Sequence, residues 1–228
     1  MSVLLAAESA PSAESRITAL RSLLAEKFPV APTRHHGVLP TGWEAMDAES
    51  GGLYRGKVTE ITGSLSVGTL CLEMLLNILG RENCFAALID PSHSFSPEDY
   101  RPHLDRLLWV LCTGSKQAIQ AADLLLRDGN LSLLILDLQM LSLRELRSIP
   151  ASTWHRFQRV TEQCNMVFAV LSSQPIVEGA SMRIAVKSRW NLQAMRQPRA
   201  ELMPQLSVQV FNRVPIDSAD SIPLRRPA

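Results

Sequence analysis

Short apolar runs alternate with amphipathic segments through the middle of the chain. The runs are nearly continuous and rich in Leu, Ile and Val, which is typical of parallel strands that are covered on both faces. The segments between them carry apolar residues at helical spacing. The pattern predicts strands at 57–62, 84–90, 106–111, 131–137 and 165–172, and helices at 69–80, 115–128 and 142–163. This alternation predicts the α/β fold class, with a mostly parallel sheet flanked by helices.

Local start and stop signals agree with these helices. Ser142 and Glu145 have the spacing of a capping box, in which each side chain bonds the backbone of the other residue. We expect Pro150 to interrupt the helix over 142–163. The run Ser96-Pro97-Glu98-Asp99 places an N-cap residue, a proline and two acids at a further helix start.

The final third of the chain loses the alternation. Residues 183–195 and 205–213 have strand patterns without a helix between them, so we expect antiparallel strands at this edge of the sheet. The tail after Val214 contains several prolines, and we expect it to be flexible. The core then spans 37–214 and the tail 215–228.

The N-terminal part, residues 1–36, is predicted to hold one amphipathic helix and a Pro-bearing linker. The helix covers residues 14–28, and its apolar positions recur at helical spacing at Ile17, Leu20, Leu24 and Phe28. Such a helix can pack on its own domain or dock on a neighbouring molecule. The sequence leaves both alternatives open.

Composition places the chain among ordinary globular proteins, with 46% hydrophobic and 20% charged residues. The net charge of +1 provides no global field that would attract nucleic acid. The four cysteines have no CxxC spacing and lie in apolar runs, which favours reduced thiols over a metal site. We see neither a basic leader nor an apolar run of about 20 residues. We therefore expect a cytoplasmic protein that does not enter the membrane.

One loop has the glycine spacing of a phosphate-binding loop. Gly63-Ser64-Leu65-Ser66-Val67-Gly68 follows a predicted strand and precedes a helix, and Thr69 and Leu70 come next. In that motif, a lysine neutralises phosphate charge and a hydroxyl binds Mg²⁺. Thr69 supplies no positive charge and Leu70 supplies no oxygen. Backbone amides remain as the only anion ligands, so we expect weak binding of ATP and Mg²⁺ at most, and no resident cofactor.

Two later strands end in polar residues that suit the same site. The apolar strand over 131–137 ends in Asp137, the arrangement in which a carboxylate holds Mg²⁺. The strand over 165–172 is followed by Gln174, a candidate sensor of the γ-phosphate. Asp137 alone could equally cap the next turn. Its order along the chain with the loop and Gln174 favours an inherited nucleotide-site geometry.

Four stretches together resemble the RecA family. They are LPTGWEAMD (39–47), GGLYRGKVTEITG (51–63), FAALIDPSHSFSPEDY (85–100) and QAIQAADLLLRDGNLSLLILD (117–137), and the resemblance extends over 38–213. It implies a RecA-like ATPase fold. By register with that family, Ser92 stands where the glutamate that activates water would be, and a serine cannot act as this base. The two DNA-contacting loops of the family are also short here.

Within the RecA family, the run IPASTWHRFQRVTE (149–162), the chain length and the altered site look most like ImuA. The resemblance implies a non-catalytic accessory role in SOS-type translesion synthesis, beside an ImuB-like protein and an error-prone C-family polymerase, with contacts to RecA or damaged DNA. Two alternatives remain open. One is a weak ATPase assisted by a neighbouring subunit through Arg213, and the other is a SulA-like inhibitor of cell division.

Two basic surfaces are candidates for contact with a partner or DNA. The segment from Arg183 to Arg199 has no acidic residue, and it contains Arg183, Lys187, Arg189, Arg196 and Arg199. An edge strand protected by cations would give the same pattern. The second surface is the predicted helix that carries Arg156 and Arg159. Trp154 and Phe157 share a face of this helix, where core packing is the competing interpretation.

Overall fold

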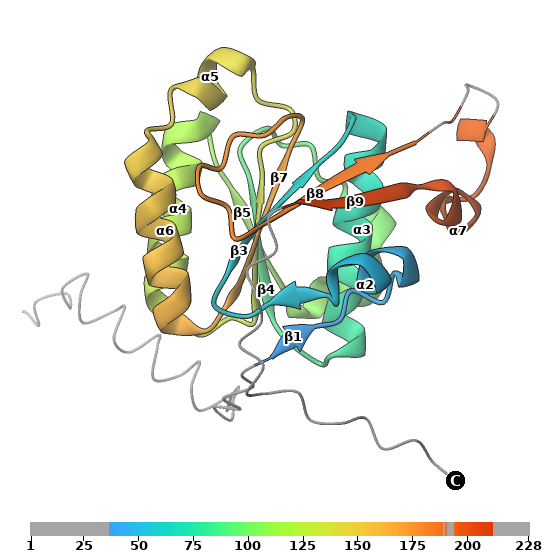
Figure 1. Cartoon of the computed structure of the whole chain (residues 1–228), viewed down its shortest axis with the longest axis horizontal. Coiled ribbons are helices and arrows are strands. Elements are labelled where there is room, and N and C mark those ends of the chain that lie inside the picture. The colour runs from blue at the N-terminus through green and yellow to red at the C-terminus, as the bar shows by residue number, and fades with distance from the viewer. Residues whose placement is uncertain (1–36, 189, 191–193, 212–228) are drawn as a thin grey trace, which may run out of the picture. The chain divides into compact units, whose positions relative to one another are not determined.

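A seven-stranded sheet organises the computed structural model, which describes residues 37–188, 190 and 194–211 (Figure 1). Its strand order is β5-β4-β6-β7-β3-β8-β9. All neighbouring strands are parallel except β8 and β9. The strands are β3 (Val58–Thr62), β4 (Ala86–Asp90), β5 (Leu107–Leu111), β6 (Leu133–Asp137), β7 (Val167–Ser172), β8 (Met182–Lys187) and β9 (Ser207–Phe211). The predicted fold class is confirmed.

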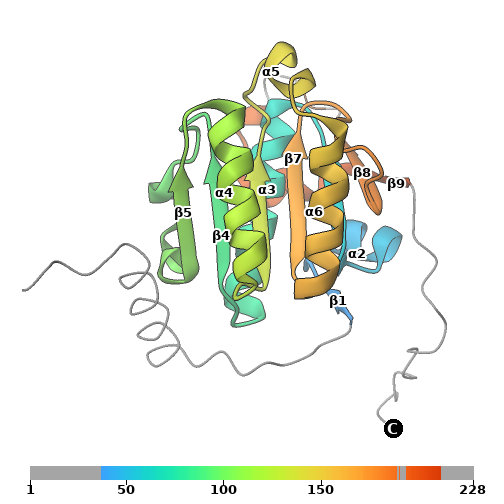
Figure 2. The ribbon, with the colours of Figure 1, turned by 90° about the vertical axis from the view of Figure 1, so that its left-hand side faces the viewer.

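Helices cover both faces of this sheet. α4 (Gly114–Asp128) and α6 (Ala151–Cys164) lie on one face, and α3 (Leu65–Arg81) and α2 (Glu44–Ser50) lie on the other (Figure 2). The smaller elements are β1 (Val38–Leu39), β2 (Leu53–Tyr54), η1 (Pro97–Arg106), α5 (Leu143–Arg147), η2 (Ala194–Arg196), α7 (Arg199–Leu202) and η3 (Met203–Gln205). The four central strands β3, β4, β6 and β7 are buried along their whole length, as their apolar runs require.

The sheet separates two apolar cores. The core beneath α3 contains Leu75, Leu76 and Leu88, all fully buried. The core beneath α4 and α6 contains Trp154 and Phe157, with exposed fractions of 2% and 0%. Their ring centroids are 6.1 Å apart in an edge-to-face arrangement, and Phe157 also packs on Phe168. These two aromatic side chains therefore stabilise the core rather than form a surface.

Several local predictions are confirmed and others need correction. The Ser142–Glu145 capping box is present, and Pro150 separates α5 from α6. The helix start at Ser96 was only partly right, because η1 is a 3₁₀ helix and the Ser96 side chain makes no capping bond. The strand expected over 183–195 ends at Lys187. The antiparallel pairing of β8 with β9 is confirmed, but the expectation that no helix lies between these strands was wrong, because η2, α7 and η3 do.

Some predictions fall on residues that the structure does not describe. They concern the N-terminal helix with Ile17, Leu20, Leu24 and Phe28, the linker, the tail, Arg189 and Arg213. These remain predictions from the sequence.

Candidate functional site

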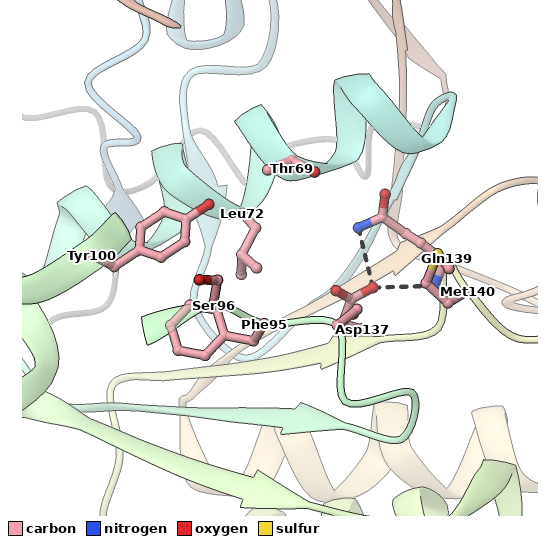
Figure 3. A pocket seen from close by; sticks show the side chains of 9 residues that line it. Thr69, Leu72, Phe95, Ser96, Tyr100, Asp137, Gln139 and Met140 are labelled. Atoms are coloured by element: carbon pink, nitrogen blue, oxygen red, sulfur yellow. Dashed lines mark hydrogen bonds between the residues drawn. The ribbon is translucent and has the colours of Figure 1, made fainter. Parts of the chain in front are cut away.

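A hollow of about 290 Å³ opens at the carboxyl ends of the central strands, beside α3 (Figure 3). In open α/β sheets this edge is where ligands bind. The hollow lies between α3, the segment after β4 and the turn after β6. Its lining consists of Thr69, Leu72, Ser94, Phe95, Ser96, Tyr100, Asp137, Gln139 and Met140.

The segment with phosphate-loop spacing is not a loop in the structure. α3 begins at Leu65, directly after Ser64, so that Gly68 lies within its first turns. The Gly68 N–H donates to the Ser64 carbonyl oxygen at 2.9 Å, as in an ordinary helix. The expected strand–loop–helix context is therefore corrected to strand–turn–helix. Because the amide of Gly68 is engaged in the helix, it cannot also bind a phosphate.

The first glycine has a packing role. A Cβ at Gly63 would lie 2.9 Å from Val67 Cγ1 and 3.1 Å from the carbonyl oxygen of Val186. Real Cβ atoms essentially never come within 3.0 Å of a neighbour, so a larger residue at position 63 would force Val67 and the Val186 backbone to shift. Close packing between the strand and the helix is therefore sufficient reason for a glycine here.

Gln139 covers the second glycine. Its side-chain amide lies where a Cβ of residue 68 would be, so the two groups are in direct contact. The same amide donates from Nε2 to Asp137 Oδ1 at 3.1 Å, and the Gln139 backbone N–H donates to that oxygen at 3.1 Å (Figure 3). The Gln139 Oε1 atom is buried and receives no hydrogen bond. Gln139 thus does two things at once: it hydrogen-bonds Asp137 and packs against Gly68.

Asp137 is a carboxyl group in an unfavourable place for charge. Its exposed fraction is 6%, and this burial raises its pKa from the ordinary value of 3.8 to about 6. The negative charge of Asp90 raises the pKa further, while the hydrogen bonds from Gln139 lower it. Even so, Asp137 is ionised in most molecules at neutral pH, and the hollow is negatively charged.

Asp90, at the end of β4, orders the segment that follows. Its Oδ1 accepts hydrogen bonds from the N–H groups of Ser92 and Ser94, and its Oδ2 accepts one from Phe95. These bonds fix the turn that places Phe95 in the wall of the hollow. Ser92 has a buried hydroxyl without a hydrogen-bond partner and does not line the hollow.

The structure brings only some of the predicted residues together. Thr69 and Asp137 line the hollow, whereas Gln174 does not. Leu70 is 3% exposed and packs in the core beneath α3. The residue that sequence reasoning missed is Gln139. Its spacing from Asp137 was a usable signal, because Asp side chains often bond the backbone two residues on.

A second buried carboxylate, Glu60, lies in the middle of β3 and is 0% exposed. Its Oε2 accepts from Arg183 Nε at 2.6 Å. Its Oε1 accepts from the N–H groups of Ile176 and Val177 at 2.6 and 3.0 Å. Arg183 Nη2 also donates to the Val177 carbonyl oxygen at 2.9 Å. The network fixes the segment between β7 and β8.

This network corrects the interpretation of the basic strip. Arg183 is neutralised by Glu60, an acid that lies 123 positions away in the sequence, so it is not a free cation for a partner. Lys187 is exposed and bonds Gln209 Oε1 at 3.4 Å. Arg199 pairs with Glu73 at 3.5 Å.

The interpretation of the second basic surface, on α6, also needs correction. Arg156 pairs with Asp123 of α4 at 3.0 Å, which ties α6 to α4. Arg159 is exposed, and the described residues offer it no ion pair. Of the two predicted contact residues on α6, Arg159 is therefore the one that makes no ion pair with the described residues.

The sequence comparisons point to one superfamily. RecA of Clavibacter michiganensis subsp. michiganensis is 37% identical over 49% of this chain and 31% of its own length. RecA of Methylococcus capsulatus is 36% identical over 47% of this chain and 33% of its own length. The matches support a RecA-superfamily protein. This chain spans about a third of the length of these relatives.

The fold comparison agrees with this superfamily. The crystal structure of the RadB recombinase matches with a TM-score of 0.55 at 16% identity, over 68% of this chain and 85% of that one. At this identity the match shows the RecA-like fold alone. No known protein-family profile matches the chain.

The described residues contain no group of three or more His, Cys, Asp or Glu side chains that could hold a metal ion. No helix within 37–211, apart from the undescribed gaps, is both long and apolar enough to cross a membrane.

Proposed function

We propose that this chain is a RecA-like accessory protein that acts by binding partners and does not hydrolyse ATP. The observation that carries the proposal is the contact of Gln139 with Gly68 and Asp137. It covers the second glycine of the phosphate-loop motif and engages Oδ1, one of the two carboxylate oxygens of Asp137.

The chemistry of the remaining groups supports the same proposal. A triphosphate needs a cation at position 69 and a hydroxyl at position 70, where this chain has Thr69 and Leu70. The side chain of Leu70 is buried in the core and carries no oxygen that could bind a metal ion. Ser92 replaces the base that would activate water. These residues do not fit Mg·ATP, and we derive no hydrolytic step.

The biological role rests on the relatives and on the resemblance of residues 149–162 to ImuA. RecA-like recombinase-related function is supported at the superfamily level. We place the chain in SOS-type DNA damage tolerance, as an adaptor in translesion synthesis. Its proposed partners are an ImuB-like protein, RecA and an error-prone C-family polymerase.

The purified protein is expected to release phosphate from Mg·ATP no faster than buffer, alone or with RecA. The assay compares the unaltered protein with Asp137→Ala, because true turnover at this site would require the carboxylate. Turnover that disappears in Asp137→Ala would show an active ATPase and reject the silent-adaptor proposal.

The adaptor role predicts that the purified protein retains the ImuB-like protein in a capture assay. We expect Arg159→Ala to weaken capture, because this exposed cation has no ion pair among the described residues. Arg127→Ala is the matched control, since Arg127 is also an exposed helix arginine but pairs with Asp123 at 2.9 Å. Failure to retain the ImuB-like protein, RecA and the polymerase would reject the adaptor role. Equal capture by the two variants would exclude Arg159 from the contact.

A further inference from the structure

The hollow beside α3 has apolar walls. Leu72 of α3 faces Phe95 and Tyr100 across the cavity, and Met140 closes one side (Figure 3). The rings of Phe95 and Tyr100 are stacked with centroids 5.1 Å apart, which makes a rigid aromatic wall. These walls can hold a narrow apolar chain through van der Waals contact.

One end of the hollow is negatively charged. The carboxylate of Asp137 points toward the cavity (Figure 3). Oδ1 accepts both hydrogen bonds from Gln139, whereas Oδ2 receives none from the described residues. The lining contains no lysine, arginine or histidine, and Asp90 ends the neighbouring strand. The Oδ2 oxygen of Asp137 is thus available to a hydrogen-bond donor that enters the hollow.

This combination selects the class of ligand. An anion would meet the carboxylate without any compensating cation. Mg²⁺ demands near-octahedral coordination by oxygen, and one available carboxylate oxygen meets little of that demand. A cation that carries hydrogen-bond donors on an apolar stem matches both the walls and the charged end. Alkylammonium and alkylguanidinium groups have this chemistry.

We propose that the hollow binds a lysine or arginine side chain of a partner protein, with its stem between Leu72 and the Phe95–Tyr100 wall and its cation on Asp137 Oδ2. The rim favours a protein over a free amine, because Met140, which lines the hollow, is 51% exposed. Apolar side chains at the mouth of a charged pocket suit contact with a polypeptide. The inference rests on the proposed function only in that Mg·ATP does not occupy the hollow.

The test follows the Met140 methyl signal by NMR in the full-length protein labelled at methionine methyl groups. The probes are the blocked pentapeptide Ala-Ala-Lys-Ala-Ala, the same peptide with neutral norleucine at its centre, and n-butylammonium chloride. We expect the lysine peptide to bind at least about tenfold more tightly than the norleucine peptide, as loss of a charged hydrogen bond implies. It should also bind more tightly than n-butylammonium. Tighter binding of n-butylammonium would overturn the protein assignment, and equal binding of the two peptides would overturn the cation site.

Substitutions in and outside the hollow test where the lysine peptide binds. Asp137→Asn should weaken the lysine peptide about tenfold, while Asp105→Asn, an exposed acid outside the hollow, should change nothing. Ser96→Phe narrows the hollow at an exposed lining position and should block the peptide without altering Asp137. Undiminished binding in both Asp137→Asn and Ser96→Phe would overturn the proposal. These outcomes do not depend on ATP turnover or on ImuB capture, so failure here is distinguishable from failure of the proposed function.

Discussion

Replacing Arg183 with methionine is expected to lower the free energy of unfolding by about 3–5 kcal/mol. Arg183→Met removes the guanidinium that neutralises Glu60, a fully buried carboxylate. An ion pair in this position contributes little net stability when both partners are present. Loss of one partner is costly, because the other is left as an uncompensated charge in the interior.

Urea unfolding followed by circular dichroism measures the effect. Lys187→Met is the matched control, because Lys187 lies on the same strand, is exposed and makes only a long hydrogen bond. We expect a change within about 0.5 kcal/mol for that variant. Adding Glu60→Gln to Arg183→Met should recover part of the loss, since a neutral amide still accepts from the Ile176 and Val177 N–H groups. A cost below about 1 kcal/mol for Arg183→Met would contradict a buried-charge origin.

The sequence predicts the sheet well because local pattern and burial agree there. The runs that form β3, β4, β6 and β7 are apolar at nearly every position, and only strands covered on both faces accommodate them. The boundaries of α5 and α6 follow from Ser142 and Pro150, which act within one or two turns of themselves.

The start of α3 could not be predicted in the same way. Glycine spacing identifies a phosphate loop only when the backbone between the glycines stays open. Here Gly63 allows β3 and α3 to pack closely, and the helix continues through Gly68. A side chain at Gly63 would crowd the carbonyl oxygen of Val186, which lies 123 positions later in the sequence, as well as Val67. The contact with Val186 cannot be inferred from the local sequence.

The site depends on side-chain pairs that local patterns do not encode. Arg183 appears as part of a basic strip until β8 is placed beside β3, where Glu60 lies. A glutamate within an otherwise apolar strand does indicate that a partner must exist, because buried charges are paired. The sequence leaves the identity of that partner open. The contact between Gln139 and Gly68 likewise joins two segments that meet only in the folded chain.

Asp137→Asn is expected to be more stabilising at pH 8 than at pH 4, with a difference of about 2.5 kcal/mol in its effect on the free energy of unfolding. Burial raises the pKa of Asp137 from 3.8 to about 6 in the folded protein. The folded state therefore holds this proton more tightly than the unfolded state. The favourable contribution is complete below pH 3.8, falls as the pH rises toward 6, and is absent above it. A neutral amide avoids the cost of burying the charge.

The measurement is the difference in unfolding free energy between Asp137→Asn and the unaltered protein at pH 4, 5, 6, 7 and 8, which cancels the titration of all other groups to first order. Asp105→Asn should show little pH dependence, since Asp105 is 73% exposed. A difference that stays constant with pH would show that burial does not raise the pKa of Asp137. A difference that grows between pH 4 and 6 would mean that the chain keeps an ionised carboxylate in the hollow at a cost to its stability. Such a cost is expected where a group serves binding, because a bound cation supplies the neutralising charge that the folded chain lacks.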